Sequence, residues 1–237
     1  MPRDTRPKSI QTTPKAVDIH ATDAGDDLLD TLQRLMPCKP RLVEEKGVLY
    51  REGEDAESVF VILHGMVKLL VHLPNGRVRI VRLQVAGDWL AIEGLGKNQT
   101  YEHTAIAVSA AEVVQFSAAR LCALLQEDAD LHAALLKRGF DHLETADRWI
   151  AEFSTGSIKA RLAHLLEFLG DLETDGISNT VNLLTVNETA DVLGVTPESV
   201  SRLLAEFKRR NVLIQVDDDD NWLYRIDKAS LDEEKKD

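Results

Sequence analysis

The chain has 237 residues, 44% of them hydrophobic, and carries a formal net charge of −12 at pH 7. This length and composition predict a globular protein of two domains. The acidic balance excludes indiscriminate attraction to phosphate, which needs clustered Lys and Arg. No apolar run approaches the roughly 20 residues of a membrane-spanning helix, and the N-terminus lacks the apolar core of a secretory signal. Because Cys38 and Cys122 are the only cysteines, we expect neither a disulfide framework nor a metal centre, and we expect a cytoplasmic protein without a membrane partner.

The pattern of apolar residues changes twice along the N-terminal half of the chain. Residues 1–25 have no apolar period, which predicts a flexible tail. A helix is expected from residue 26, where leucines recur at helical spacing at positions 28, 32 and 35. Short β-forming runs separated by glycines then predict an antiparallel β module as far as residue 128. Within it, Asn75-Gly76 lies between two alternating apolar runs, which is typical of a tight hairpin.

Residues 129–154 have a long helical period. One row of residues steps by three and four and forms a single seam of a heptad pattern. Leu135, Phe140 and Trp149 form a second apolar face that could pack on the β module. We therefore predict that two such helices pair, although the seam could instead pack on the β module. The predicted dimer seam consists of Leu136, Gly139, Leu143, Ala146, Ile150 and Phe153.

Two helices are expected between residues 184 and 213. Thr185 followed by Glu188 is the pattern in which each side chain satisfies a free backbone N–H at a helix start. Gly194 would form the turn, Thr196 would cap the second helix, and Pro197 suits its first position. Apolar residues of the second helix are expected to face inward: Val200, Leu203, Leu204 and Phe207.

The outward face of the second helix has the composition of a DNA-reading surface. Arg can bind guanine bidentately, Glu can accept from cytosine, and Ser can donate or accept. Basic residues at the far end, including Arg210, suit phosphate contacts. The alternative is an ordinary solvated helical hairpin. The predicted DNA-binding residues are Thr196, Pro197, Glu198, Ser201, Arg202, Lys208 and Arg209.

Two segments resemble one protein family. YREGEDAESVFVILHGMVKLL resembles the first part of the cyclic-nucleotide-binding β-roll, and GVTPESVSRLLAEFKRRNVL resembles the recognition helix of the CRP/FNR superfamily of bacterial transcription regulators. The resemblance implies an α+β fold with an N-terminal antiparallel β-roll (a double-stranded β-helix) over 26–128, a dimerisation helix over 129–154 and a winged helix-turn-helix over 155–230. It also implies a non-enzymatic homodimer that binds double-stranded DNA and RNA polymerase.

Within that family, the recognition helix is nearest the FNR-like branch. Glu198, Ser201 and Arg202 match its E-x-x-S-R pattern, whereas Pro197 replaces the Arg that precedes Glu in the cyclic-AMP receptors. The resemblance therefore implies palindromic operators with TTGAT or TTGAC half-sites. The alternative function is that of a cyclic-nucleotide-binding regulator acting through cyclic AMP or through protein contacts.

The effector side departs from the well-known branches. By position, Ala91-Ile92-Glu93 replaces the G-E-L motif of cyclic-AMP receptors, and His103-Thr104 replaces the Arg-Ser pair that binds phosphate. A pocket without a permanent cation compensates a phosphate poorly, so cyclic AMP is not the expected effector. The candidate effector pocket consists of Ala91, Ile92, Glu93, Gly94, His103, Thr104, Ala146 and Asp147.

The sequence does not determine which cofactor, if any, the protein binds. Two cysteines cannot supply the four that the FNR iron-sulfur cluster needs. The AIEGL and EHTAIAV stretches resemble the pocket of the nitrogen-oxide-responsive regulators related to FNR. This resemblance implies haem as a candidate cofactor, with His64, His103 or His142 as its candidate ligand. A cupin-type metalloenzyme is disfavoured because the strand run lacks a His-x-His pair. The acidic run 217–220 could bind calcium, but a solvated turn that repels DNA phosphate is the favoured interpretation.

Overall fold

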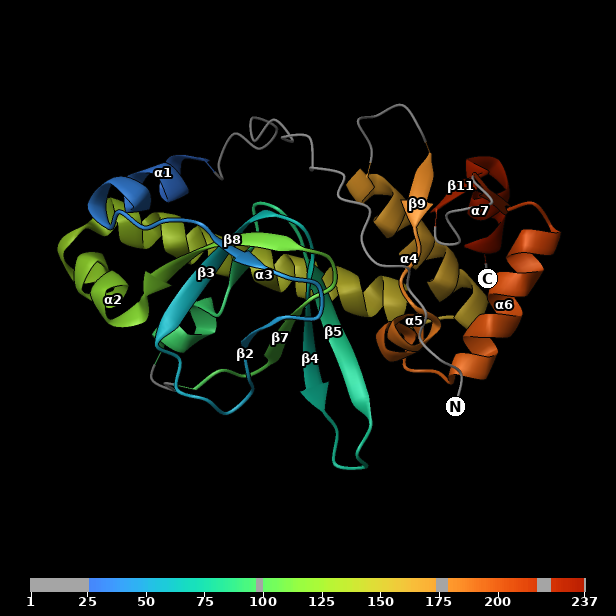
Figure 1. Cartoon of the computed structure of the whole chain (residues 1–237), viewed down its shortest axis with the longest axis horizontal. Coiled ribbons are helices and arrows are strands. Elements are labelled where there is room, and N and C mark those ends of the chain that lie inside the picture. Colours follow the sequence, from blue (N-terminus) through green and yellow to red (C-terminus); the bar gives the residue numbers. More distant parts are fainter. Residues whose placement is uncertain (1–25, 97–99, 174–178, 217–222, 237) are drawn as a thin grey trace.

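The computed structural model describes residues 26–96, 100–173, 179–216 and 223–236 (Figure 1). The predicted N-terminal tail and the acidic run 217–220 both lie outside these ranges. The first described element is helix α1 (Asp26–Leu35). Its Leu28 and Leu32 are buried as expected, whereas Leu35 is exposed.

Two four-stranded antiparallel sheets form the β-roll. One sheet has the order β1-β8-β3-β6 and the other β2-β7-β4-β5. The predicted hairpin is confirmed: β4 pairs with β5, and Gly76 in the connecting turn has a positive φ of 77°. A short 3-10 helix, η2 (Ile92–Leu95), follows β6. The strands are β1 (Arg41–Val43), β2 (Val48–Tyr50), β3 (Ser58–His64), β4 (Val67–His72), β5 (Val78–Gln84), β6 (Trp89–Leu90), β7 (Thr104–Ala107) and β8 (Ala111–Ser117).

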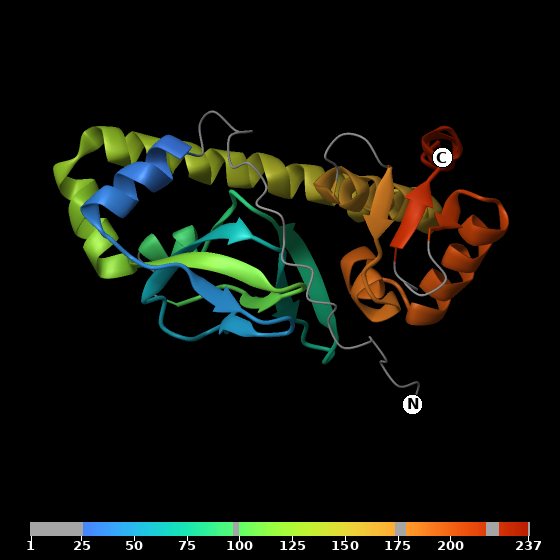
Figure 2. The same ribbon diagram turned by 45° about the horizontal axis from the view of Figure 1, so that its top comes forward.

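Helix α3 (Ala129–Phe153) connects the two halves of the molecule. It follows α2 (Ala118–Glu127), and Asp128 between them caps it by accepting from the backbone N–H groups of Asp130 and Leu131. Figure 2 shows α3 running along the β-roll and reaching the C-terminal unit. Its bounds lie close to the predicted range 129–154.

The C-terminal unit combines helices with a small sheet. The sheet has the order β10-β11-β9 and packs beside the helices (Figure 1). The α+β class and the predicted order of β-roll, long helix and helix-turn-helix with a small sheet are therefore confirmed. The elements are α4 (Ile158–Glu173), β9 (Thr180–Asn182), α5 (Val186–Leu193), α6 (Pro197–Arg209), β10 (Leu213–Gln215), β11 (Leu223–Ile226) and α7 (Lys228–Glu234).

One hydrophobic core extends across the boundary between the two units. Leu70 and Ile80 of the β-roll belong to the same buried cluster as Leu162, Leu193 and Phe207 of the C-terminal unit. Two further clusters lie inside the roll and beneath α1 and α2. Because burial of apolar surface is the main stabilising force in folding, the shared core fixes the C-terminal unit against the face of β4 and β5.

Candidate functional site

The helix pair α5–α6 begins with the predicted capping box. Thr185 Oγ1 accepts from the backbone N–H of Glu188 at 3.2 Å, and Glu188 Oε2 accepts from the backbone N–H of Thr185 at 3.0 Å. The Thr185 hydroxyl also lies 2.6 Å from the same carboxylate. These bonds satisfy donors that a helix start otherwise leaves free, so α5 has a defined first turn.

The turn between the helices is equally well defined. Gly194 ends α5 with a φ of 67°, a left-handed conformation that glycine adopts without strain. Thr196 Oγ1 then accepts from the backbone N–H of Ser199, and Pro197 occupies the first turn of α6. Half-buried Val195 packs against the core. The orientation of α6 relative to α5 is therefore set by local contacts.

Helix α6 has one buried face and one exposed face. Val200, Leu204 and Phe207 are buried, while Leu203 is partly buried against the same core. Glu198, Ser201 and Arg202 are exposed together. Hydrogen bonds from its own backbone N–H and from Thr196 hold the pKa of Glu198 below its ordinary value, so this carboxylate is an acceptor at neutral pH. The face is therefore free to meet the edges of base pairs.

The basic end of α6 is partly engaged within the protein. Lys208 Nζ donates to the hydroxyl of Tyr224 at 2.7 Å and lies 4.5 Å from the centre of that ring. Arg210 forms ion pairs with Glu206 and the buried Glu234. Among the residues that the structure describes, Arg209 is the member of this basic group that forms neither an ion pair nor a side-chain hydrogen bond. Lys208 and Arg210 would have to leave these partners in order to bind phosphate. The sequence pattern did not indicate these internal contacts.

The predicted dimer seam on α3 is mostly exposed. Leu136, Leu143 and Ile150, spaced seven residues apart, are each more than half exposed at 55%, 62% and 56%. Gly139 and Ala146 lie between them with intermediate exposure, and a Cβ added to Gly139 would meet nothing within 4 Å. An apolar row of this length on a helix is the kind of surface that pairs with another helix.

Two aromatic residues of α3 occupy the reverse of their predicted positions. Phe153, placed in the seam by the heptad pattern, is only 1% exposed and packs edge-to-face against Trp149 and Phe168. Phe140, predicted to face the β module, is 61% exposed. A straight helix drifts from a seven-residue repeat by about 20° per heptad, and α4 packs against the end of α3. The prediction for Phe153 was therefore wrong, and Phe140 extends the exposed apolar face.

A cavity of about 340 Å³ lies between the β-roll and α3 at the predicted effector site. It contains four of the predicted pocket residues: Ile92, Glu93, His103 and Ala146. The remaining lining residues were not predicted: Arg82, Glu102, Gly139, His142 and Leu143. The pocket is therefore assembled from β5, η2, the segment before β7, and α3.

The other four predicted pocket residues do not line this cavity. Ala91 is buried beneath η2 with a φ of 63°, and a Cβ on Gly94 would collide with Ala56. Thr104 Oγ1 instead accepts from the backbone N–H of Glu52 at 3.0 Å. Asp147 is exposed on α3. The correspondence by position identified the right segment of the chain, but it did not identify which side chains of that segment point into the cavity.

Charged groups of both signs share the effector pocket. Glu93 Oε1 lies 3.4 Å from His103 Nδ1, and both buried atoms lack a hydrogen-bond partner of good geometry among the described residues. Burial raises the pKa of Glu93, but His103, a backbone N–H and Arg82 outweigh it, and the pKa is lowered overall. Burial, followed by Arg82, lowers the pKa of His142. The expectation of a pocket without a permanent cation was wrong, because Arg82 lines it.

The fold brings two of the three candidate haem ligands into one pocket. His103 and His142 both line the effector pocket. His64 lies elsewhere, with its Nε2 atom 4.0 Å from a carboxylate oxygen of Glu112. The described residues contain no group of three or more His, Cys, Asp or Glu side chains that could hold a metal ion.

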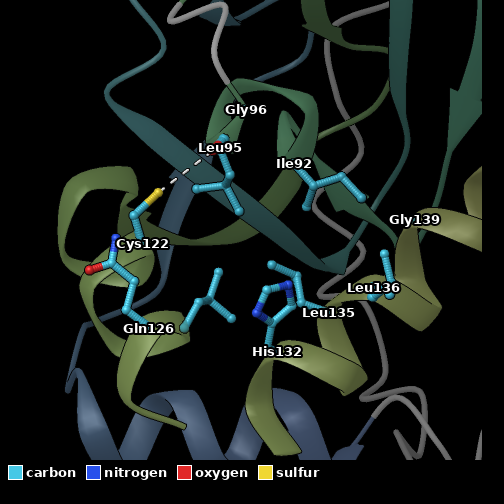
Figure 3. A pocket seen from close by; sticks show the side chains of 10 residues that line it. Ile92, Leu95, Gly96, Cys122, Gln126, His132, Leu135, Leu136 and Gly139 are labelled. Carbon is cyan, nitrogen blue, oxygen red and sulfur yellow. Dashed lines mark hydrogen bonds between the residues drawn. The ribbon is translucent and has the colours of Figure 1, made fainter. Parts of the chain in front are cut away.

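A larger cavity, lined mainly by uncharged side chains, adjoins the candidate effector pocket. It measures about 630 Å³ and lies between η2, α2 and α3, where Figure 3 shows leucine and isoleucine side chains converging. Cys122 lies at one edge, with Sγ 3.8 Å from the carbonyl oxygen of Leu95. Ile92 and Gly139 line both cavities, so the two share a wall formed by η2 and the exposed face of α3.

None of the helices in the described part of the chain is both long enough and apolar enough to cross a membrane.

Comparison with known proteins agrees with this architecture. A model of the cyclic nucleotide-binding domain matches residues 40–128, and a model of the Crp-like helix-turn-helix domain matches residues 160–233. The chain is 30% identical over 191 residues to the transcriptional regulator LdrP of Thermus thermophilus, covering 80% of this chain and 93% of that protein. It is 28% identical over 178 residues to the nitrogen fixation regulation protein FixK of Bradyrhizobium diazoefficiens, covering 70% of each.

A solved structure has the same fold. The crystal structure of a CRP-family transcriptional regulator from Thermus thermophilus superposes with a TM-score of 0.71 at 25% identity, covering 83% of this chain and 97% of that one. With a β-roll, a long helix and a capped helix-turn-helix in this order, the chain belongs to the CRP/FNR family of DNA-binding transcription regulators.

Proposed function

We propose that the protein is a homodimer that reads a two-fold symmetric operator with α6 and is controlled by a small effector bound in the β-roll. The observation that carries this proposal is the exposed set Glu198, Ser201 and Arg202 on a helix whose start is fixed by Thr196 and Gly194. Residues near the start of a recognition helix are those that meet base edges in the major groove. A fixed start therefore gives these three side chains a defined geometry.

Half-sites of the TTGAT or TTGAC kind are the proposed targets. Both contain a G·C pair, whose guanine accepts a bidentate Arg and whose cytosine offers an amino donor to Glu. The exposed Arg202 and the ionised Glu198 provide these two partners. Ser201, between them on the same face, can donate or accept.

Fluorescence anisotropy with labelled duplexes tests this proposal. Palindromes with TTGAT or TTGAC half-sites would be compared with scrambled duplexes of equal length and composition across a range of salt concentrations. Binding that is tighter to the palindromes at every salt concentration supports sequence-specific reading. Weak binding that is equal for all duplexes would contradict it and favour a regulator that acts through protein contacts.

The exposed α3 row supports the dimer. Leu143→Asp would place a charge in the centre of the row, where a paired helix would have to bury it. We expect this variant to sediment as a monomer at concentrations where the parent protein sediments as a dimer. Leu42→Asp is the matched control, because Leu42 is 71% exposed on β1, outside the row. A parent protein that is monomeric throughout would contradict the dimer.

The effector pocket suits a small polar molecule with an anionic group. Arg82 can compensate the anion, while Glu93 and His103 offer buried atoms that lack well-aligned hydrogen-bond partners within the described ranges. A porphyrin is a poorer fit, because its apolar face would have to cover these charged groups. Cyclic AMP becomes a reasonable first probe because of Arg82, although its expected Arg-Ser pair is absent from the sequence.

Thermal-shift measurements with cyclic AMP and other small anions test the pocket. A ligand present at 100 times its Kd stabilises the folded state by about 2.7 kcal/mol. That shift should disappear in Arg82→Met and persist in Arg41→Met, which removes an exposed cation from β1. A haem absorption band in the purified protein would contradict the proposed effector class.

RNA polymerase is the proposed further partner of the DNA-bound dimer. The family assignment supports it, since the chain belongs to a family of transcription regulators. Transcription in vitro from a promoter with the preferred operator tests it. A change in transcript yield that requires an intact operator supports the partnership, and an unchanged yield with a fully occupied operator would contradict it.

A further inference from the structure

The β-roll holds the start of α5 through a buried ion pair. Lys68 on β4 places its Nζ 2.9 Å from Glu188 Oε1, although the two residues are 120 positions apart. Both side chains are largely buried, at 15% and 13% exposure. The same Glu188 carboxylate completes the capping box of α5. One carboxylate therefore closes the first turn of the helix and binds the sensor unit.

The β-roll also holds the end of α5. Arg79 on β5 donates to the carbonyl of Asp191 at 3.3 Å, and Arg77, two residues before it, donates to the carbonyl of Val195 at 3.2 Å. The last carbonyls of a helix have no partners within the helix and form the negative end of its dipole. Guanidinium groups from the β4–β5 hairpin thus satisfy backbone groups that α5 and its turn leave free.

Arg79 also connects this contact to the end of α3. Its Nη2 atom donates to Ser154 Oγ at the end of α3, at 3.2 Å. A Cβ added to Gly194 would collide with the same guanidinium, so the tight turn of the helix pair and the arginine fit closely. The β4–β5 hairpin, the end of α3 and the turn of the DNA-reading unit therefore meet at one side chain.

Helix α6 lies beyond α5 and its turn, as seen from the β-roll. In Figures 1 and 2 it forms the end of the molecule opposite α1, with α5 between it and the β-roll. Apolar packing of Ile80 and Leu70 against the C-terminal core supports the same arrangement. Since Gly194 and Thr196 fix α6 on α5, any contact that orients α5 also orients α6.

We propose that Lys68, Arg77 and Arg79 are positioning residues for DNA reading, which orient α5 and thereby set the direction in which α6 meets the operator. This inference rests on the proposed operator reading. In a symmetric dimer the direction of each recognition helix sets the half-site spacing that can be bound. The three cations therefore determine spacing, while Glu198, Ser201 and Arg202 determine base choice.

A double-mutant cycle tests the buried pair. Lys68→Met removes the cation, and Glu188→Gln removes the charge while keeping a side chain that suits a capping box. Each single variant is expected to bind the preferred operator about tenfold more weakly, within the usual range of coupling between sites. The double variant should be no weaker than either single variant, and Arg41→Met should bind like the parent protein. Unchanged or tighter binding by both single variants would overturn the proposal, as would losses that simply add.

Operator spacing provides a readout that a merely structural role would not change. The parent protein should bind poorly to operators whose half-sites are moved apart by one base pair. Lys68→Met and Arg79→Met should lose much of this discrimination and keep their base preference within each half-site. Loss of base preference with unchanged spacing discrimination would contradict the assigned role.

A distance measurement separates this inference from the proposed function. Spin labels on Glu44→Cys in the roll and Ala205→Cys on α6, with Cys38 and Cys122 replaced by Ser, report the orientation of α6 without DNA. The distance distribution should be narrow in the parent protein and broader in Lys68→Met. If the parent protein shows no sequence-specific binding but Lys68→Met still broadens the distribution, only the proposed operator reading is refuted. An unchanged distribution would refute the positioning role.

Discussion

The helix pair α5–α6 and the candidate effector pocket differ in how their side chains are brought together. In the helix pair, Thr185 and Glu188 bond to each other within one turn, and Thr196 bonds to Ser199 in the same way. In the pocket, Arg82 comes from β5, Glu93 from η2 and His142 from α3. The geometry of the helix pair is thus encoded over a few residues, whereas the geometry of the pocket depends on how the β-roll, η2 and α3 pack together.

This difference explains why the two regions tolerate amino-acid substitutions to different extents. A local motif keeps its shape while its exposed residues vary, so the base preference of α6 can alter without affecting the fold. A pocket built from distant elements changes whenever the strands or α3 shift. The comparison predicts that substitutions in the helix pair change either the free energy of unfolding or operator binding, but not both. It also predicts that charged groups near the pocket make the free energy of unfolding depend on pH.

The largest effect is expected from the buried side of α6. Phe207 is fully buried in the core shared by the two units, and Phe207→Ala should lower the free energy of unfolding by roughly 3 to 5 kcal/mol because a cavity remains. Urea unfolding measures the change. Ser201→Ala, on the exposed side, should stay within about 0.5 kcal/mol of the parent. Similar losses in both variants would show that the two faces of α6 are not separable.

The exposed side should behave in the opposite way. Arg202→Ala should weaken binding to the preferred operator by about 1 to 3 kcal/mol and relax the choice of one base pair, with little change in stability. Anisotropy titrations with single-base operator variants measure this loss. Arg209→Ala is the control, since a phosphate contact should be lost equally on all sequences. An equal loss on every sequence for Arg202→Ala would place Arg202 on phosphate instead.

Near the pocket, stability should depend on the protonation of Asp88. Burial raises the pKa of Asp88 from 3.8 to about 6, so the folded state holds this proton more tightly than the unfolded chain does. Stability from this group is therefore greatest below pH 4 and falls, by about 2 kcal/mol, as the pH rises to 6. Unfolding measured from pH 4 to 7 should show a flatter profile in Asp88→Asn. Parallel profiles for the two proteins would refute the assignment.

The smallest effect is expected from a single local bond. Thr185→Ala removes the hydroxyl that accepts from the Glu188 backbone N–H and should lower the free energy of unfolding by about 1 kcal/mol. Thermal unfolding measures the difference, and Thr185→Ser, which retains the hydroxyl, should remain close to the parent. If Thr185→Ala has no effect, the start of α5 is fixed by tertiary packing rather than by its own sequence.

Local features could be predicted because their partners lie close in sequence. The capping residues Thr185 and Thr196, the turn at Gly194 and the hairpin at Gly76 each have a recognisable spacing, and the structure confirms each of them. The inward position of Val200 followed from helical periodicity and is also confirmed.

Features that depend on distant partners could not be predicted in the same way. Arg82 enters the pocket only because β5 packs against α3, and no spacing in the sequence indicates this. Tyr224 similarly engages Lys208 from a strand beyond the basic run. Phe153 was misplaced because a heptad pattern describes the helix alone, whereas Phe168 of α4 determines which face is covered.

The engagement of Lys208 by Tyr224, and of Arg210 by Glu234, has a consequence for ionic strength. Each DNA phosphate neutralised by a protein cation releases condensed counterions, and the logarithm of the binding constant then falls with the logarithm of the salt concentration by about 0.9 per contact. Within the described part of the chain, Arg209 is the one residue of this basic group that no other side chain engages. The basic end of α6 therefore neutralises few phosphates. Operator occupancy should therefore change little when the salt concentration rises, and most of the affinity should come from the match between helix and groove.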